Sequence, residues 1–174
     1  MIHKKYKKNY FIQILVIAFF ASAWMAQLSW SQHNHHGFYC TFSGTDSDSS
    51  AETYFRLGTN ATFLEYTLKV NNIENITMAH IHLGIPGDIN SPVVWLYPPS
   101  PPPKPIPGPF SGVLAEGVIT DDDLIGPLRG KPLSALIEHM RKDHTFVNIH
   151  TEDHPQGSIC GEVRLFESGK PENE

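Results

Sequence analysis

The chain has 174 residues and a formal net charge of −5, with 13 lysines and arginines against 18 aspartates and glutamates. Its first 31 residues contain four lysines and no acidic residue, so the remaining 143 residues carry a net charge of −9. An acidic domain without a basic patch argues against nucleic acids and anionic membrane surfaces as partners. A length of 143 residues is typical of one domain, which buries roughly two-thirds of the surface of its unfolded chain.

The N-terminal segment, residues 1–31, has the pattern of a secretory signal peptide. Four lysines within the first eight residues precede an apolar run over residues 10–26, and small residues at 21–23 and 29–31 offer two cleavage positions. The alternative is an uncleaved N-terminal anchor, because a run of about 17 residues is at the short limit for spanning a bilayer. In both cases we expect the rest of the chain to be exported, in an extracellular, cell-surface or periplasmic location. A membrane is a partner only if this segment is retained.

The expected elements follow a β pattern along most of the chain. Residues 32–36 read QHNHH and predict a flexible histidine-rich lead-in, a kind of tract that binds copper, nickel or zinc weakly. After it, apolar and polar residues alternate in short stretches separated by turn residues, which is typical of half-buried strands. We expect strands at residues 38–43, 53–57, 63–70, 76–83, 93–97, 113–119, 145–151 and 158–166.

Three features interrupt this pattern. Asn71 and Asn72 are expected to end the third strand. Residues 98–109 contain eight prolines and predict a stiff surface loop, because proline cannot join the interior of a sheet. Residues 132–142 are the only convincing helix, with apolar residues at helical spacing after a proline that suits the first turn. Short strands with one small helix indicate an all-β, antiparallel β-sandwich, followed by a disordered tail at 167–174.

The two cysteines stand near the two ends of the mature domain. In an exported chain, an even and minimal count favours one disulfide, between Cys40 and Cys160. The alternative is a pair of buried thiols. A zinc site built on cysteines fits less well, because the sequence has no C-x-x-C spacing.

Two histidine-bearing strands 70 positions apart carry the strongest chemical signal. In residues 79–83 and 147–151 the aliphatic side chains share one face, so His80, His82 and His150 all fall on the opposite, outer face. If the strands are neighbours, the three imidazoles converge, and such a set suits copper or zinc. His154, four residues after His150, is the candidate fourth ligand. The alternative is that these histidines only make structural hydrogen bonds.

These stretches resemble the chordin-type (CHRD) domain, over residues 37–166. The similarity rests on five motifs in register, none of which is decisive alone. They are AHIH at 79–82 with Gly84, GDINSPVV at 87–94, GVITDDDL at 117–124, LSALIEHM at 133–140, and FVNIHT at 146–151 followed by Gly157 and GEV at 161–163. The proline-rich loop is longer than the family pattern, and His154 stands where another polar residue is usual.

The resemblance implies a fold and leaves the activity open. The CHRD family is found in chordin and in secreted bacterial and archaeal proteins, and it implies an immunoglobulin-like, Greek-key β-barrel distantly similar to copper,zinc superoxide dismutase. His80, His82 and His150 look like three copper ligands of those enzymes. The resemblance ends there, because residues 84–112, where their zinc ligands would lie, contain no histidine.

Three functions remain open at this point. The first is an exported domain that binds copper or zinc through a surface histidine cluster and has no catalytic role. The second is a non-catalytic adhesion or scaffold module with an extracellular protein or surface partner. The third is a copper redox enzyme of the dismutase type, which needs an open copper position and basic residues that guide the substrate. The sequence shows no catalytic triad, carboxylate pair or phosphate loop, so we expect binding rather than catalysis.

Overall fold

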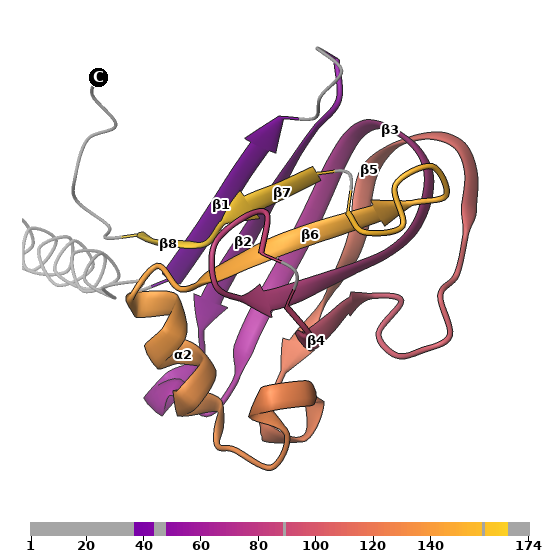
Figure 1. The fold of residues 1–174 in the computed structure, drawn as a ribbon. Helices are drawn as coiled ribbons and strands as arrows, with labels where there is room; N and C mark the ends of the chain where they lie inside the picture. The colour runs from indigo at the N-terminus through magenta and orange to yellow at the C-terminus, as the bar shows by residue number, and fades with distance from the viewer. Residues whose placement is uncertain (1–36, 44–47, 89, 158, 167–174) are drawn as a thin grey trace, which may run out of the picture. The chain divides into compact units, whose positions relative to one another are not determined.

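A computed structural model describes residues 37–43, 48–88, 90–157 and 159–166, all within the unit His35–Glu174. In this part of the chain, antiparallel strands form one sheet and a single α-helix packs against it, which confirms the all-β fold class (Figure 1). The signal-peptide segment, the histidine-rich lead-in and the C-terminal tail lie outside the described residues. The elements are β1 (Gly37–Ser43), β2 (Ser50–Leu57), β3 (Leu64–Leu83), β4 (Pro92–Tyr97), β5 (Ile106–Ile119), α2 (Leu133–Arg141), β6 (Thr145–Thr151), β7 (Ile159–Glu162) and β8 (Arg164–Phe166).

The long strand β3 belongs to both halves of the sheet. Its first half pairs with β2 and β5, the β5 ladder continues to Ile76, and its second half pairs with β6 and β4. The expectation of two strands separated at Asn71 and Asn72 is therefore wrong. Asn72 and Asn75 adopt φ values of 51° and 50°, a left-handed conformation that asparagine tolerates better than most residues. The chain changes direction there through irregularities in the ladder without leaving it.

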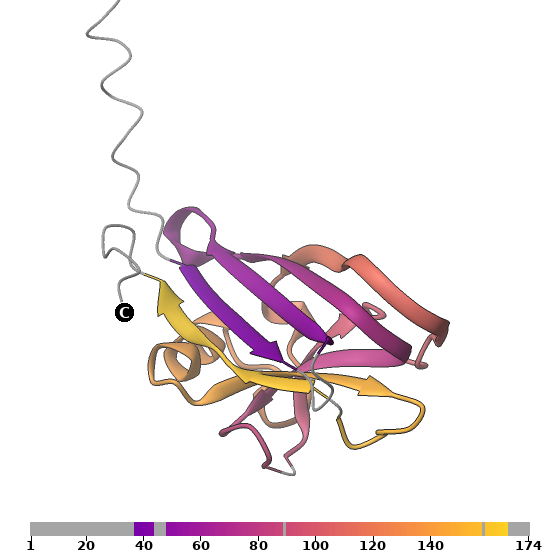
Figure 2. The same cartoon turned by 90° about the horizontal axis from the view of Figure 1, so that it is seen from above.

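The sheet nearly closes on itself through its last two strands. β7 pairs with β6, while β8 pairs with β1 at the other end of the strand order β7-β6-β3-β2-β1-β8. Only Val163 separates β7 from β8, and its N–H donates to the carbonyl of Thr145 at 2.9 Å. Figure 2 shows the resulting layers, with β1 and β2 above β6 and β7. The single strand expected at 158–166 is thus a pair of short strands that connects the two layers.

The core lies between these layers and is closed at one end by α2. The helix buries Leu133, Leu136, Ile137 and Met140 on one face, as the sequence periodicity predicts. Burial of an aliphatic side chain of this size contributes about 1.5–3 kcal/mol. The same core contains Leu68 of β3 and Ile149 of β6, both with no exposed surface. No helix among the described residues has the length and hydropathy needed to cross a membrane.

The proline-rich segment is only partly a loop. β5 begins at Ile106, so Pro107 and Pro109 lie in a strand that was expected to be irregular. β5 is an edge strand that pairs with β3, and Gly108 donates its N–H to the side chain of Asn75 on β3 at 2.9 Å. Because N–H directions alternate along a strand, the nitrogens of the two prolines point away from β3. Their missing N–H groups remove no ladder hydrogen bond.

The two cysteines lie on strands from opposite ends of the domain. Cys40 is buried on β1, and Cys160 belongs to β7, but the side chain of Cys160 lies outside what the structure describes. Gly161 is the β7 residue that faces Cys40, since a Cβ atom there would lie 3.0 Å from the Cys40 sulfur, whereas the register pairs Cys160 with Asn148 of β6. The Cys40–Cys160 disulfide stays a prediction.

A non-reduced peptide map of the full-length protein purified under oxidising conditions should contain the linked Cys40 and Cys160 peptides. Closure of a loop of about 120 residues in the unfolded chain should raise the free energy of unfolding by roughly 4–5 kcal/mol, less any native strain. Urea denaturation with and without reductant measures this difference, and a Cys40→Ser, Cys160→Ser variant provides the reductant-insensitive control. Quantitative alkylation of both thiols in the oxidised native protein would contradict the prediction.

Candidate metal centre

Three histidines meet where the second half of β3 pairs with β6. His80 and His82 belong to β3 and His150 belongs to β6, and the register pairs His80 with Asn148 and Met78 with His150. Residues paired across an antiparallel ladder point to the same side, so all three rings lie on one face. Their ring centroids are 5.1–6.1 Å apart, and one ligand nitrogen from each lies within 4.8 Å of the others. We call these residues the histidine cluster.

The histidine cluster is buried, whereas the sequence predicted an outer, solvent-facing surface. The exposed fractions of His80, His82 and His150 are 3%, 6% and 6%. Trp95 of β4 contacts the ring of His80 edge-on at a centroid distance of 4.2 Å, and Phe146 of β6 stacks on His82 at 5.1 Å. Strand alternation predicts the correct face of the sheet. It does not predict that aromatic side chains and two loops cover that face.

Backbone carbonyls define which ring nitrogen carries the proton in two of the three histidines. The Nδ1 of His82 lies 2.8 Å from the carbonyl oxygen of Asn90, and the Nδ1 of His150 lies 3.0 Å from that of Pro155. A carbonyl oxygen only accepts, so both Nδ1 atoms are the donors. In the neutral rings, the Nε2 atoms of His82 and His150 therefore carry lone pairs. This is the usual arrangement of a metal-ligating histidine whose second nitrogen is held by an outer partner.

The remaining nitrogens provide the test of whether a metal ion fits. His80 Nδ1 lies 3.2 Å from His150 Nε2, so without an ion His80 donates to the lone pair of His150. The Nε2 atoms of His80 and His82 are buried and have no hydrogen-bond partner among the described residues. An orphaned buried polar atom costs about 1–3 kcal/mol. An ion bound by lone pairs of this cluster would relieve part of that cost, and the donor set suits copper or zinc.

Burial favours the neutral form of all three rings. Desolvation lowers the pKa of His80 from 6.5 to about 3, with further lowering by the neighbouring His150 and His82. Desolvation also lowers the pKa values of His82 and His150, although their hydrogen bonds to Asn90 and Pro155 oppose it. A histidine must be neutral to bind a metal ion. The cluster therefore presents its lone pairs at physiological pH without first losing protons.

The loop after β3 holds the acceptor of His82 in place. Asn90 donates its side-chain Nδ2 to the carbonyl of Leu83 at 2.9 Å, and the carboxylate of Asp88 accepts from the N–H of Ile85 at 3.1 Å. Gly84 opens this loop with a φ of 104°, and a Cβ there would lie 2.3 Å from the Asp88 carboxylate. The loop is thus fastened to the end of β3 that carries His82.

The loop after β6 holds the backbone acceptor of His150 in place. Asn148 donates its Nδ2 to the carbonyl of Gln156 at 3.1 Å. Gly157 has a φ of 115°, and a Cβ at this position would lie 2.1 Å from the Asn148 Oδ1, so no larger side chain fits. The loop therefore packs directly on the amide of Asn148, and this contact fixes the Pro155 carbonyl that binds His150.

The fourth predicted ligand is not part of the group. His154 has an exposed side chain, and its backbone shapes the turn through the N–H of Gly157, which donates to its carbonyl at 3.0 Å. Its N–H donates to the Thr151 hydroxyl at 3.2 Å. Sequence reasoning missed Trp95 and Asn90. Strand alternation did place Asn148 on the histidine face. The carbonyl acceptors of Asn90 and Pro155 leave no signal in the pattern of side chains, because every residue has a carbonyl.

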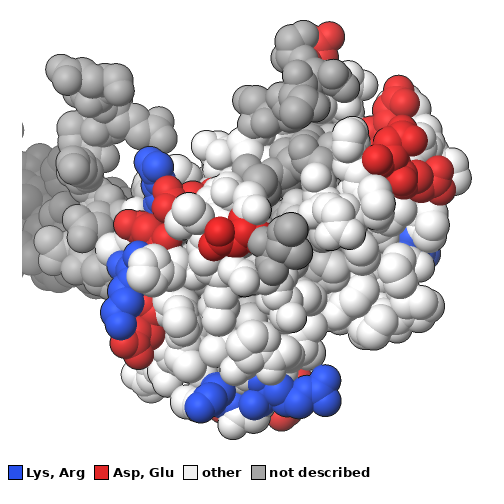
Figure 3. Space-filling view, in the orientation of Figure 1, with Lys and Arg blue, Asp and Glu red and all other residues white. Residues whose placement is uncertain are grey.

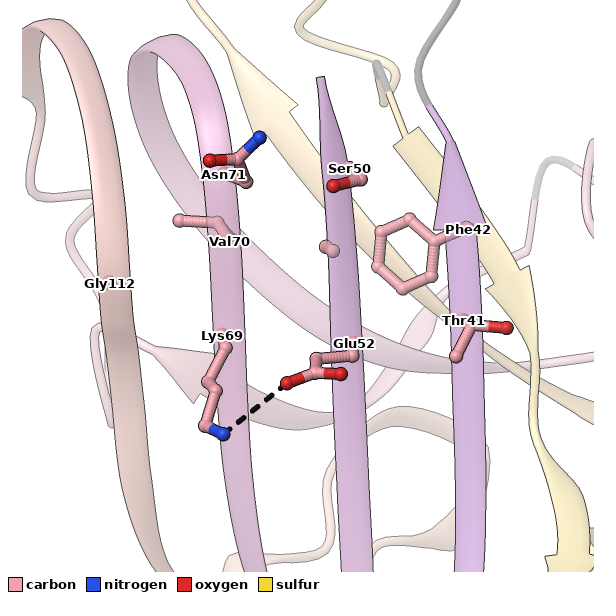
Figure 4. A pocket seen from close by; sticks show the side chains of 9 residues that line it. Thr41, Phe42, Ser50, Glu52, Lys69, Val70, Asn71 and Gly112 are labelled. Carbon is pink, nitrogen blue, oxygen red and sulfur yellow. Dashed lines mark ion pairs between the residues drawn. The ribbon is translucent and has the colours of Figure 1, made fainter. Parts of the chain in front are cut away.

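One described hollow lies elsewhere and shows no converging chemistry. It has a volume of about 570 Å³ and lies between β1, β2 and the first half of β3 (Figure 4). Glu52 and Lys69 form an ion pair of 3.3 Å in it, and both side chains are substantially exposed. Exposed pairs contribute about 0–1 kcal/mol. The histidine cluster is therefore the better candidate for a functional site.

Comparison with known proteins identifies a family but no close relative. A family model described as the CHRD domain matches residues 34–163, more than half of the chain. No curated protein and no solved structure matches the chain significantly. The expected similarity to copper,zinc superoxide dismutase is therefore not shown.

Acid should destabilise the metal-free protein before its carboxylates titrate. Below about pH 6.5 the unfolded chain protonates its histidines, whereas folded His80 stays neutral down to about pH 3. The free energy of unfolding should therefore fall as the pH drops from 7 towards 5. Each histidine that stays neutral in the fold adds a slope of up to about 1.4 kcal/mol per pH unit.

Urea denaturation at several pH values measures this slope. His80→Phe keeps a ring against Trp95 but removes the titrating group, so its slope should be smaller. His144→Ala removes an imidazole at an exposed position and is the control for loss of a histidine outside the cluster. An equal slope in the His80→Phe and parent proteins would show that His80 is not the group responsible.

Proposed function

This chain belongs to the CHRD domain family, and we propose that it is an exported, non-catalytic domain that binds one copper or zinc ion through the histidine cluster. One observation carries the proposal. His80, His82 and His150 bring neutral ring nitrogens within 4.8 Å of one another, and two buried nitrogens have no hydrogen-bond partner among the described residues. Three structural histidines would be expected to use such nitrogens in hydrogen bonds.

The surroundings of the cluster support binding over redox catalysis. The three rings are at most 6% exposed, so a diffusing substrate would not reach an ion between them without movement of the covering groups. A dismutase also needs basic residues that guide its anionic substrate. Lysine and arginine side chains lie at the left, lower and right edges of the face seen in Figure 3. The net charge of −9 outside residues 1–31 would repel such a substrate.

An adhesion or scaffold role is the second candidate, on the evidence of exposed apolar side chains. Tyr54, Val118 and Phe166 are 48–53% exposed. Tyr54 and Phe166 also line one hollow of about 270 Å³ beside β1 and β2. Exposed aromatic residues around a concave surface are typical of protein contact sites. This surface lies on the other half of the sheet from the histidine cluster, so the two roles are compatible.

Export rests on residues 1–31, which carry the signal-peptide pattern, and on the family. N-terminal sequencing of the natively produced protein should begin between residues 24 and 33. Cleavage within that interval follows from the two sets of small residues after the apolar run. An intact Met1 in the membrane fraction would instead identify an anchor, and an intact Met1 in the cytosol would contradict export.

The full-length protein should bind one equivalent of copper or zinc, measured by elemental analysis after dialysis against a weak chelator. Because residues 32–36 provide a second set of imidazoles, the measurement is made in a variant with His33, His35 and His36 changed to alanine. In that background, His82→Asn and His150→Asn should each remove stoichiometric binding. Asparagine retains a polar side chain in place of the ring.

His144→Ala, at an exposed position, is the matched control and should bind as the parent does. His154→Ala tests the fourth predicted ligand and should also retain binding, because this side chain lies outside the cluster. Circular dichroism confirms the fold of each variant. Retained stoichiometry in the His80→Phe, His82→Asn, His150→Asn triple variant would overturn the proposal.

A further inference from the structure

We propose that the histidine cluster selects monovalent copper, Cu(I), over Cu(II) and Zn(II). This inference rests on the proposed metal-binding function and goes one step beyond it. It depends on three properties of the site: the charge of its ligands, the number of its ligands and the groups that cover it.

Among the described side chains, the ligand set carries no negative charge. The group that satisfies metal geometry consists of three histidines, and no described carboxylate or thiolate belongs to it. The nearby carboxylate of Asp88 lies on an exposed residue and accepts from Ile85 and Asn90. The charge of a bound ion is therefore not neutralised by its ligands. The cost of transferring an uncompensated ion from water rises with the square of its charge, so burial penalises a divalent ion far more than a monovalent one.

The number of ligands also favours Cu(I) over the divalent ions. Cu(II) prefers tetragonal sets of nitrogen and oxygen ligands, and Zn(II) prefers four ligands in a tetrahedron. Among the described residues the cluster offers three, and His154 is not one of them. Asn148 also lies on this face, but its amide packs against Gly157 and donates to Gln156. A divalent ion would need water as a further ligand, whereas Cu(I) is stable with three nitrogens.

The groups that cover the site disfavour a water molecule as a further ligand. Trp95 contacts the His80 ring at 4.2 Å and Phe146 stacks on His82 at 5.1 Å, so apolar rings flank two of the ligands. The unpartnered Nε2 atoms of His80 and His82 are buried. An aquo ligand in such surroundings would itself lack hydrogen-bond partners.

The test compares the three ions on the full-length protein with His33, His35 and His36 changed to alanine. Anaerobic competition with a colorimetric Cu(I) chelator gives the Cu(I) affinity, and separate chelators give those for Cu(II) and Zn(II). We expect one Cu(I) per chain, bound at least tenfold more tightly than either divalent ion. X-ray absorption of the Cu(I) form should show three nitrogen ligands.

A charge variant isolates the electrostatic part of the argument. Asn148 is paired with His80 across the ladder and lies on the same face. Asn148→Asp adds a negative charge beside the cluster and should shift the preference towards Zn(II) by roughly tenfold, because a divalent ion gains twice as much from that charge. Asn148→Ala loses the same hydrogen bond to Gln156 without adding charge, so a loss of affinity for all ions that the two variants share reports the loosened loop, and only Asn148→Asp should shift the preference between ions.

The outcomes separate this inference from the function on which it rests. Equal or tighter binding of Zn(II) or Cu(II) at the cluster would overturn the selectivity and leave the metal site standing. An identical ion preference in Asn148→Asp and Asn148→Ala would overturn the charge argument. If none of the three ions binds, or if binding survives in the His80→Phe, His82→Asn, His150→Asn variant, both the inference and the proposed function are wrong.

Discussion

The pairing of the second half of β3 with β6 is the constraint on which the rest of the structure depends. Its register places His80 beside Asn148 and Met78 beside His150, so side chains 70 positions apart share one small area. A slip of one residue would turn the cluster towards the core and the aliphatic set towards the loops. Ile81 and Ile149, both fully buried, oppose such a slip because their burial would be lost.

The pairing of β3 with β6 also determines the role of the two loops that follow these strands. Both loops begin where a histidine strand ends, and each returns a backbone carbonyl to the nearest imidazole. The side chains of Asn90 and Asn148 hold these loops through hydrogen bonds to backbone carbonyls. The ring orientations therefore exist before any ion is present. Such preorganisation reduces the ordering cost that a flexible site would incur on binding.

Much of this arrangement could be predicted from the sequence, and the exceptions have physical causes. Alternation predicted the strands that carry the histidines and the face that they share. It did not predict burial, because the covering groups come from β4 and from loops whose paths depend on backbone hydrogen bonds. The continuity of β3 through Asn72 and Asn75 was missed because asparagine signals a turn equally well. Pro107 and Pro109 were assigned to a loop because the sequence does not show which strand lies at an edge.

The use of carbonyl oxygens of Asn90 and Pro155 as partners of the imidazoles has a consequence for how this domain can vary. Every amino acid supplies a carbonyl oxygen, so a substitution at the acceptor position keeps the acceptor, whereas an inserted or deleted residue moves it away from the ring. In these two loops, length is therefore under stronger constraint than the identity of the acceptor residue. Among the described contacts, the turn at residues 98–105 gives no such acceptor to the cluster, so the imidazoles place no constraint on its length.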